Sequence, residues 1–182
     1  YLNGNQLSKI NSIVFKDLKN LKILNLGSNK LSFLQNDIFS NLLSLEYLYI
    51  ENNRIRNLNY QMFVNLLFLN SIGFQQNQIE LLDMTTFGNL SNMQIMFGLM
   101  NFIETLNNDT FASMSNLFFL SLNSNKLNRI EINAFRNLKN LQTLNLNNNR
   151  LRYLNPGCFK DLENLKVLEL NENCYTNIEV PV

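Results

Sequence analysis

The stretch Leu141-Gln142-Thr143-Leu144-Asn145-Leu146-Asn147-Asn148-Asn149-Arg150-Leu151 follows the pattern L-x-x-L-x-L-x-x-N-x-L, which recurs, intact or degraded, along the whole 182-residue chain. The Asn of the pattern returns every 24 residues without insertion or deletion, at Asn5, Asn29, Asn53, Asn77, Asn101, Asn125, Asn149 and Asn173. A fixed period of this length indicates a stacked array of similar coils, because one such unit cannot bury its apolar faces alone.

Two apolar columns keep the same period. The first consists of Phe15, Phe39, Phe63, Phe87, Phe111, Phe135 and Phe159, and the second of Leu18, Leu42, Leu66, Leu90, Met114, Leu138 and Leu162. We therefore expect a single domain over residues 1–182, with a partial coil over 1–20 and a shortened last coil over 165–182. Full coils, numbered one to six, are expected to begin at Leu21, Leu45, Leu69, Met93, Leu117 and Leu141.

The centre of each coil alternates apolar and other residues with a period of two, which is typical of a β-strand that buries one face. Successive strands run in the same direction, so the pattern predicts a parallel sheet, with the rest of each coil as the crossover. Where a strand leaves the sheet its backbone groups lose their partners, and an Asn amide can bond to them. We expect this structural role for Asn29, Asn53, Asn77, Asn101, Asn125 and Asn149.

These columns resemble the leucine-rich repeat family, and in particular its typical 24-residue, extracellular-type subclass, which adds a Phe in the return segment. The resemblance covers essentially the whole chain. It implies an α/β-type repeat solenoid, a horseshoe with a parallel β-sheet on its concave face and mostly irregular or short-helical convex segments. The repeat type is similar to that of Toll-like receptor ectodomains and variable lymphocyte receptors, and it implies a binding scaffold.

Coil four departs from the pattern, because Gly98 occupies an inward position that is a large apolar residue in the other coils. In coil three the same position is Phe74, the one aromatic residue of that column. Protein interiors tolerate neither voids nor overfilling. We therefore predict that the ring of Phe74 fills the volume that Gly98 leaves.

The outward residues of the strands are predicted to line the concave face, which such arrays offer to ligands. Large apolar residues there, and on the adjoining rim, form the predicted ligand-binding site: Tyr47, Tyr49, Ile95, Phe97, Leu99, Met100, Phe102 and Phe119. Ser71 and Gly73 would form a shallow depression between its aromatic walls. Such a cluster is larger than the apolar patches that soluble monomers usually expose. The alternative is a shifted strand at Gly98 that turns Phe97 or Leu99 inward.

No reactive chemistry is visible in the sequence. It contains no His and no G-x-G-x-x-G loop, so the usual catalytic triads and phosphate loops are excluded. We expect no enzyme, no cofactor and no metal site. The net charge of +1 does not favour nucleic acid as a partner. Basic residues that follow the Asn column are interpreted as solvated rim charge, with steering of an acidic partner as the alternative: Lys30, Arg54, Arg56, Lys126, Arg129, Arg150 and Arg152.

Two glycosylation acceptor triplets, Asn89-Leu90-Ser91 and Asn108-Asp109-Thr110, lie in predicted return segments. They are compatible with an extracellular protein, secreted or exposed at a cell surface. The chain begins in mid-repeat and has no apolar run long enough to span a bilayer, so we expect a membrane link only through an anchor in a parent protein. Cys158 is expected to be a buried thiol, while the role of Cys174 stays open.

The expected function is recognition of a protein ligand by an extracellular receptor or by a secreted immune or adhesion protein. Two alternatives remain at this point. One is a cytoplasmic scaffold built from the same repeat. The other is a structural homodimer that associates through the same concave face.

Overall fold

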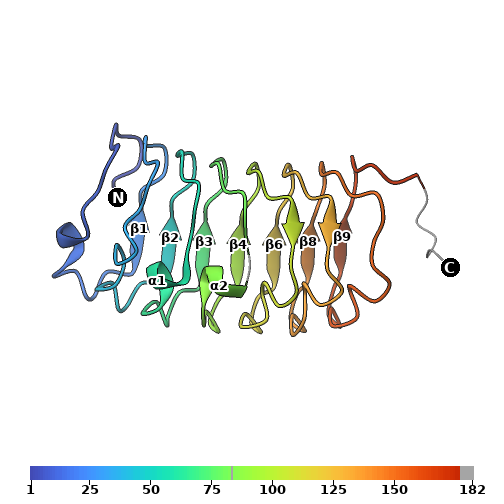
Figure 1. Cartoon of the computed structure of the whole chain (residues 1–182). Helices are drawn as coiled ribbons and strands as arrows, with labels where there is room; N and C mark the ends of the chain where they lie inside the picture. Colours follow the sequence, from blue (N-terminus) through green and yellow to red (C-terminus); the bar gives the residue numbers. More distant parts are fainter. Residues whose placement is uncertain (83, 177–182) are drawn as a thin grey trace.

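In the computed structural model, which describes residues 1–82 and 84–176, the coils stack side by side into one elongated array (Figure 1). One strand from each coil forms a seven-stranded parallel sheet along the array. Its strands are β1 (Ile23–Asn25), β2 (Tyr47–Tyr49), β3 (Ser71–Gly73), β4 (Ile95–Phe97), β6 (Phe119–Ser121), β8 (Thr143–Asn145) and β9 (Val167–Glu169). The predicted parallel-sheet solenoid is confirmed, and positions 177–182 of the expected last coil lie outside the described residues.

Each strand pairs with the next at a constant offset, so that Leu24 lies opposite Leu48 and Gly73 lies opposite Phe97. This register follows from the constant coil length. It continues unbroken through β4, where Phe97 lies opposite Ser121. Gly98 is buried and Phe97 is partly exposed. The alternative of a shifted strand at Gly98 is therefore wrong.

The return segments contain little regular structure, as predicted. Within the described residues they hold a 3-10 helix, η1 (Ser12–Phe15), and two single-turn helices, α1 (Tyr60–Phe63) and α2 (Met84–Phe87). Asn59 caps α1, because its Oδ1 accepts a hydrogen bond from the backbone N–H of Gln61 at 3.1 Å. A second, two-stranded sheet pairs β5 (Thr105–Leu106) with β7 (Arg129–Ile130), which the sequence pattern did not predict.

The Phe column forms a buried spine in the return segments. Its first six members are at most 3% exposed, while Phe159 at the last coil is partly exposed. The ring centroids of Phe63 and Phe87 lie 5.5 Å apart, and those of Phe111 and Phe135 lie 6.2 Å apart. Rings at these separations attract one another, so the spine ties neighbouring coils together.

The recurring Asn side chains bond each coil to the one before it. Asn77 Nδ2 donates to the carbonyl oxygens of Phe74 in its own coil and of Ile50 in the preceding coil, both at 3.0 Å. Its Oδ1 accepts from the backbone N–H of Ile55 at 2.9 Å. The same three bonds recur at the buried Asn53, Asn101, Asn125 and Asn149. Asn29 makes them too but is only half-buried.

The space beside Gly98 is filled by its neighbours. A Cβ atom at Gly98 would lie 2.6 Å from two ring atoms of Phe74 and 2.9 Å from Cδ2 of Leu122. Phe74 is fully buried, and its ring also lies 6.1 Å from that of Phe87. The predicted compensation between Phe74 and Gly98 is therefore confirmed.

The turn before each recurring Asn contains a residue in the left-handed conformation. Its φ is between 50° and 57° at Ser28, Asn52, Gln76, Met100, Ser124, Asn148 and Glu172. Gly4, with φ of 70°, holds the same position in the partial coil. Residues other than Gly and Asn adopt this conformation at a cost. Gly4, Asn52 and Asn148 at this position are residue types that favour the turn, and the apolar pattern alone does not reveal them.

A second series of Asn side chains bonds the coils on the segment that enters the sheet. Asn92 Nδ2 donates to the carbonyl oxygen of Leu67, 25 residues earlier, at 2.7 Å. Equivalent bonds of 2.8–2.9 Å are made by Asn116, Asn140 and Asn164. Phe68 occupies this position one coil before Asn92 and is 60% exposed, so the series begins only after it.

Candidate recognition surface

The outward side chains of the seven-stranded sheet form one surface, which we call the open face. It has three columns, two on the strands and one just beyond them. The first column, on the strands, consists of Ile23, Tyr47, Ser71, Ile95, Phe119, Thr143 and Val167. The second, also on the strands, consists of Asn25, Tyr49, Gly73, Phe97, Ser121, Asn145 and Glu169. The third, just beyond the strands, consists of Gly27, Glu51, Gln75, Leu99, Asn123, Asn147 and Asn171. No Lys or Arg occurs at these positions.

Ile95, Phe97 and Phe119 form the apolar centre of the open face. Ile95 lies opposite Phe119 in the sheet, whereas Phe97 lies opposite the smaller Ser121. The ring centroids of Phe97 and Phe119 are 5.1 Å apart with an interplanar angle of 49°. All three apolar side chains are partly exposed. They therefore pack against each other and still present apolar surface to solvent.

Tyr47 and Tyr49 lie on β2 and are also partly exposed, with β3 between them and Phe97. The predicted depression at Ser71 and Gly73 is not an open hollow, because Ser71 is only 3% exposed and Gly73 is buried. A Cβ atom at Gly73 would lie 3.2 Å from Cδ1 of Tyr49. The expectation was wrong because the missing side chain makes room for the neighbouring Tyr49 ring.

Toward the last coils the open face becomes polar, and its side chains bond to one another. Ser121 Oγ donates to Asn123 Oδ1 at 2.7 Å. Asn147 Nδ2 donates to Glu169 Oε2 at 2.7 Å, and Asn145 Oδ1 accepts from the backbone N–H of Asn147 at 3.0 Å. These polar groups are already satisfied within the protein.

Glu51 and Gln75 differ from the other polar residues of the open face. They occupy the third column on neighbouring coils, and both are partly exposed. Glu51 Oε2 and Gln75 Oε1 are nevertheless buried atoms without a hydrogen-bond partner among the described residues. Neither residue belongs to the site predicted from the sequence, although Glu51 is the one charged residue of its column.

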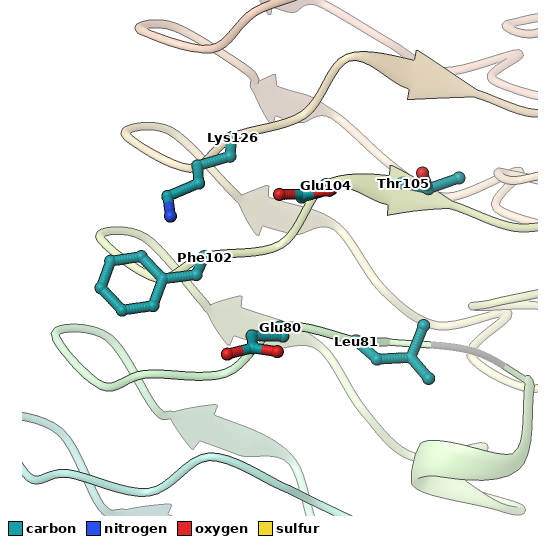
Figure 2. A pocket seen from close by; sticks show the side chains of 6 residues that line it. All are labelled: Glu80, Leu81, Phe102, Glu104, Thr105 and Lys126. Atoms are coloured by element: carbon teal, nitrogen blue, oxygen red, sulfur yellow. The ribbon is translucent and has the colours of Figure 1, made fainter.

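The remaining predicted site residues lie beyond the end of β4, in the segment that leads away from the sheet. Leu99 is partly exposed on the open face, Met100 is 46% exposed in the left-handed turn, and Phe102 is 40% exposed beyond it. Phe102 lines a separate hollow of about 460 Å³ together with Glu80, Leu81, Glu104, Thr105 and Lys126 (Figure 2). Lys126 Nζ lies 4.2 Å from the centroid of the Phe102 ring, a cation–π contact. Phe102 therefore belongs to the rim and lies apart from the apolar centre.

Both candidate glycosylation residues, Asn89 and Asn108, are exposed in return segments. Ser91 of the first triplet is exposed as well. Thr110 of the second triplet is 3% exposed, and its hydroxyl donates to the carbonyl oxygen of Asn107 at 2.9 Å. A glycan on Asn108 would therefore have to be attached before this segment folds.

The thiol of Cys158 is 4% exposed, and burial raises its pKa to about 11. This is the opposite of the lowered pKa of reactive thiols. Cys174 is exposed and free. In residues 1–82 and 84–176, no group of three or more acidic or Cys side chains is arranged to hold a metal ion. Nor does this part of the chain contain a helix with the length and apolar character needed to cross a membrane.

Comparison with known proteins gives consistent matches. The leucine rich repeat family model matches residues 1–55, 99–151 and 139–180. The crystal structure of a TLR13–ssRNA13 complex matches with a TM-score of 0.90 and 34% identity, over 94% of this chain and 24% of that chain. An internalin (inlF) from Listeria monocytogenes matches with a TM-score of 0.72 and 28% identity, over 90% of this chain and 45% of that chain. No curated protein sequence matches.

Proposed function

Because this chain belongs to the leucine-rich repeat family, whose members are typically not catalysts, we propose that it is a recognition module that binds a protein partner on its open face. The chain spans about a quarter of the matched TLR13 chain and less than half of the internalin chain. The proposal therefore concerns this segment, as part of a receptor or of a secreted immune or adhesion protein.

The apolar centre at Ile95, Phe97 and Phe119 is the observation that carries the proposal. The Phe spine and the two Asn series already hold the coils together away from the open face, while these three side chains remain partly exposed on it. Aromatic side chains bury ~150–250 Å² each on association. Residues of this kind dominate the binding energy of protein interfaces when they lie in the desolvated centre.

A protein partner fits the open face better than a nucleic acid. The matched TLR13 structure is a complex with ssRNA13. Nucleic-acid binding, however, draws much of its affinity from Lys and Arg side chains that neutralise phosphates. The three columns of the open face contain no Lys or Arg, and the chain as a whole carries a net charge of only +1.

The test is capture of proteins from native extracts or secretions by three immobilised proteins. These are the wild type, the double variant Phe97→Asp/Phe119→Asp, and the control Phe33→Asp, which changes a 68% exposed Phe outside the open face. We expect the wild type and the control to capture the same partner, and the double variant to capture at least about tenfold less. Equal capture by a folded double variant would overturn the proposal.

Two measurements make this result interpretable. Urea unfolding of all three proteins shows whether the double variant is folded. Sedimentation of the wild type over a range of concentrations tests the alternative that the open face joins two copies of the chain. A mass that rises with concentration for the wild type, but not for the double variant, would reassign the face to homodimerisation.

The similarity to TLR13 supports an extracellular location, secreted or as part of a cell-surface ectodomain. A cytoplasmic scaffold is the alternative. Mass spectrometry of native material distinguishes them at the peptides that contain Asn89 and Asn108. A glycan at either residue would support the extracellular proposal, whereas unmodified protein recovered from cytosol would contradict it.

A further inference from the structure

A second group of exposed apolar side chains lies outside the open face, on coil two and the end of coil one. Val64, Leu67 and Phe68 of coil two are 53%, 55% and 60% exposed. Leu43 holds the position of Leu67 one coil earlier and is 45% exposed. We call these four residues the return patch. Neighbouring apolar side chains that stay exposed mark a surface that something else covers more often than single ones do.

The return patch is a local departure from the repeat. The positions of Leu67 and Phe68 are polar in each of the four coils that follow. They hold Ser91 and Asn92, Ser115 and Asn116, Lys139 and Asn140, and Glu163 and Asn164. Stacking of the coils therefore does not require apolar residues at these two positions.

The glycosylation acceptor Asn89 falls beside the return patch in the register of the coils. It holds in coil three the position that Asn65 holds in coil two. Asn65 lies between Val64 and Leu67 in the sequence and is exposed, as they are. Because neighbouring coils stack without any offset, Asn89 emerges one coil away from the same part of the surface.

Contacts on both sides of Asn89 confirm this placement. A Cβ atom at Gly88 would lie 3.6 Å from Cβ of Tyr60, the first residue of α1. Asn92 Nδ2 donates to the carbonyl oxygen of Leu67 at 2.7 Å. Asn89 itself is exposed. The segment that contains Asn89 therefore runs alongside the segment that contains the return patch.

The two acceptor triplets differ in how freely they can be modified. Asn89 and Ser91 are both exposed. In the other triplet, Asn108 Oδ1 accepts a hydrogen bond from the backbone N–H of Asn133 at 3.0 Å, and Thr110 is buried. The folded chain thus leaves the first triplet open and engages the second in its own structure.

We propose that Asn89 carries an N-linked glycan whose first sugars cover the return patch. This inference rests on the extracellular location proposed above. The faces of sugar rings present C–H groups, which pack against apolar side chains and against the negative face of an aromatic ring such as that of Phe68. The hydroxyl groups of the same sugars stay in water. A glycan here would replace an apolar surface with a hydrated one.

The test uses protein secreted by cultured animal cells, as the wild type and three variants. Asn89→Gln removes the proposed acceptor, and Asn108→Gln is the matched control at the other triplet. Leu67→Gln/Phe68→Asn makes the patch polar with neutral residues and creates no new acceptor triplet. Mass spectrometry first locates the glycans. The fluorescence of anilinonaphthalene sulfonate, a dye that brightens on apolar surfaces, is then measured before and after enzymatic removal of N-glycans.

We expect a glycan at Asn89 and, for the wild type and Asn108→Gln, at least about a twofold rise in dye fluorescence when glycans are removed. Asn89→Gln should be bright from the start and unchanged by the enzyme. Leu67→Gln/Phe68→Asn should stay dim with and without its glycan, because the surface that the dye binds is gone.

Several results would overturn the cover. They are secreted protein without a glycan at Asn89, fluorescence that does not change when that glycan is removed, and an equal rise in Leu67→Gln/Phe68→Asn. A lower urea midpoint after glycan removal would attribute the rise to unfolding, with the same consequence. A mass that increases with concentration for the secreted wild type, but not for Leu67→Gln/Phe68→Asn, would assign the patch to self-association instead.

These outcomes are separate from those that test the recognition function. Capture of a partner through Phe97 and Phe119 can succeed whether or not a glycan covers the return patch. Unmodified protein recovered from cytosol would contradict the extracellular location and the cover together. A glycan at Asn89 without any effect on the dye would overturn the cover alone.

Discussion

At the scale of single residues, Gly98 and Phe74 should behave as a coupled pair. Gly98→Leu would crowd the ring of Phe74 and is expected to destabilise the protein by roughly 1–3 kcal/mol. Adding Phe74→Leu removes the crowding and should largely restore the free energy of unfolding. Urea unfolding of the wild type, both single variants and the double variant measures the coupling. Simple additivity of the two changes would contradict it.

The recurring Asn side chains should matter most in the middle of the array. Asn77→Ala removes bonds to four backbone groups in a buried setting and should cost about 2–3 kcal/mol of unfolding free energy. The equivalent Asn29→Ala acts at a half-buried position where water can replace the lost bonds, so it should cost less. Urea denaturation compares the two variants directly. Equal losses would mean that burial does not set the contribution of these amides.

Cys158 should make stability depend on alkaline pH. Burial raises its pKa from 9.0 to about 11, so the unfolded chain releases the thiol proton at a lower pH than the folded protein does. Its contribution is therefore complete below pH 9 and is lost as the pH rises to 11, a change of about 2 kcal/mol at most. Cys158→Val should show a weaker loss of unfolding free energy between these pH values, while the exposed Cys174→Val should match the wild type. The same steep loss in Cys158→Val would contradict this assignment.

At the scale of the coil, substitutions in the left-handed turn before the recurring Asn should change the stability of the protein. Met100 holds this turn in coil four with φ of 55°, a conformation that Asn adopts more readily. Met100→Asn should therefore stabilise the protein by about 0.5–1 kcal/mol. Asn52→Met makes the reverse change two coils earlier and should destabilise it by a similar amount. Thermal unfolding of the two variants checks the sign; a stable Asn52→Met protein would show that the turn imposes no preference.

The period of the sequence was enough to predict the main elements. A strand with one buried face follows from alternation such as that of Leu144 and Leu146, and parallel register follows from a coil length that never changes. The Phe74 ring over Gly98 was predictable because two unusual residues share one column. The second sheet was not predictable, since the pairing of β5 with β7 depends on backbone positions in segments without a regular pattern.

The candidate site was less predictable than the fold. Sequence columns identify which side chains face outward, and the Phe97–Phe119 contact involves two of them. They do not specify rotamers, so the Tyr49 ring over Gly73 could not be foreseen. Nor does an apolar pattern reveal that Glu51 Oε2 has no donor among residues 1–82 and 84–176, because hydrogen bonding depends on which atoms of neighbouring coils meet. Whether these residues bind a partner stays a prediction.

At the scale of the whole molecule, protection from hydrogen exchange should fall toward the last described coil. Each coil contacts only its neighbours, so a coil with a neighbour on one side is held less firmly. The inward residues Leu48 and Leu144 are fully buried, whereas the equivalent Leu168 of β9 is 39% exposed. Exchange measured by mass spectrometry should be slowest over β2–β6 and faster over β9. Uniform protection along the array would indicate one cooperative unit instead.

The unbroken spacing of the coils also bears on how such a protein can change in length. Removing residues 117–140 would join Asn116 to Leu141, and every later side chain would keep its relation to the turn before it. Phe74 and Gly98 would stay together, and Leu146 would replace Leu122 beside them. The deletion would also remove Phe119 and bring Thr143 to its place opposite Ile95, so a partner would meet an open face that is one coil shorter and lacks one ring of the apolar centre. Loss or duplication of whole 24-residue coils thus changes the length of the array while the packing of the buried side chains is kept.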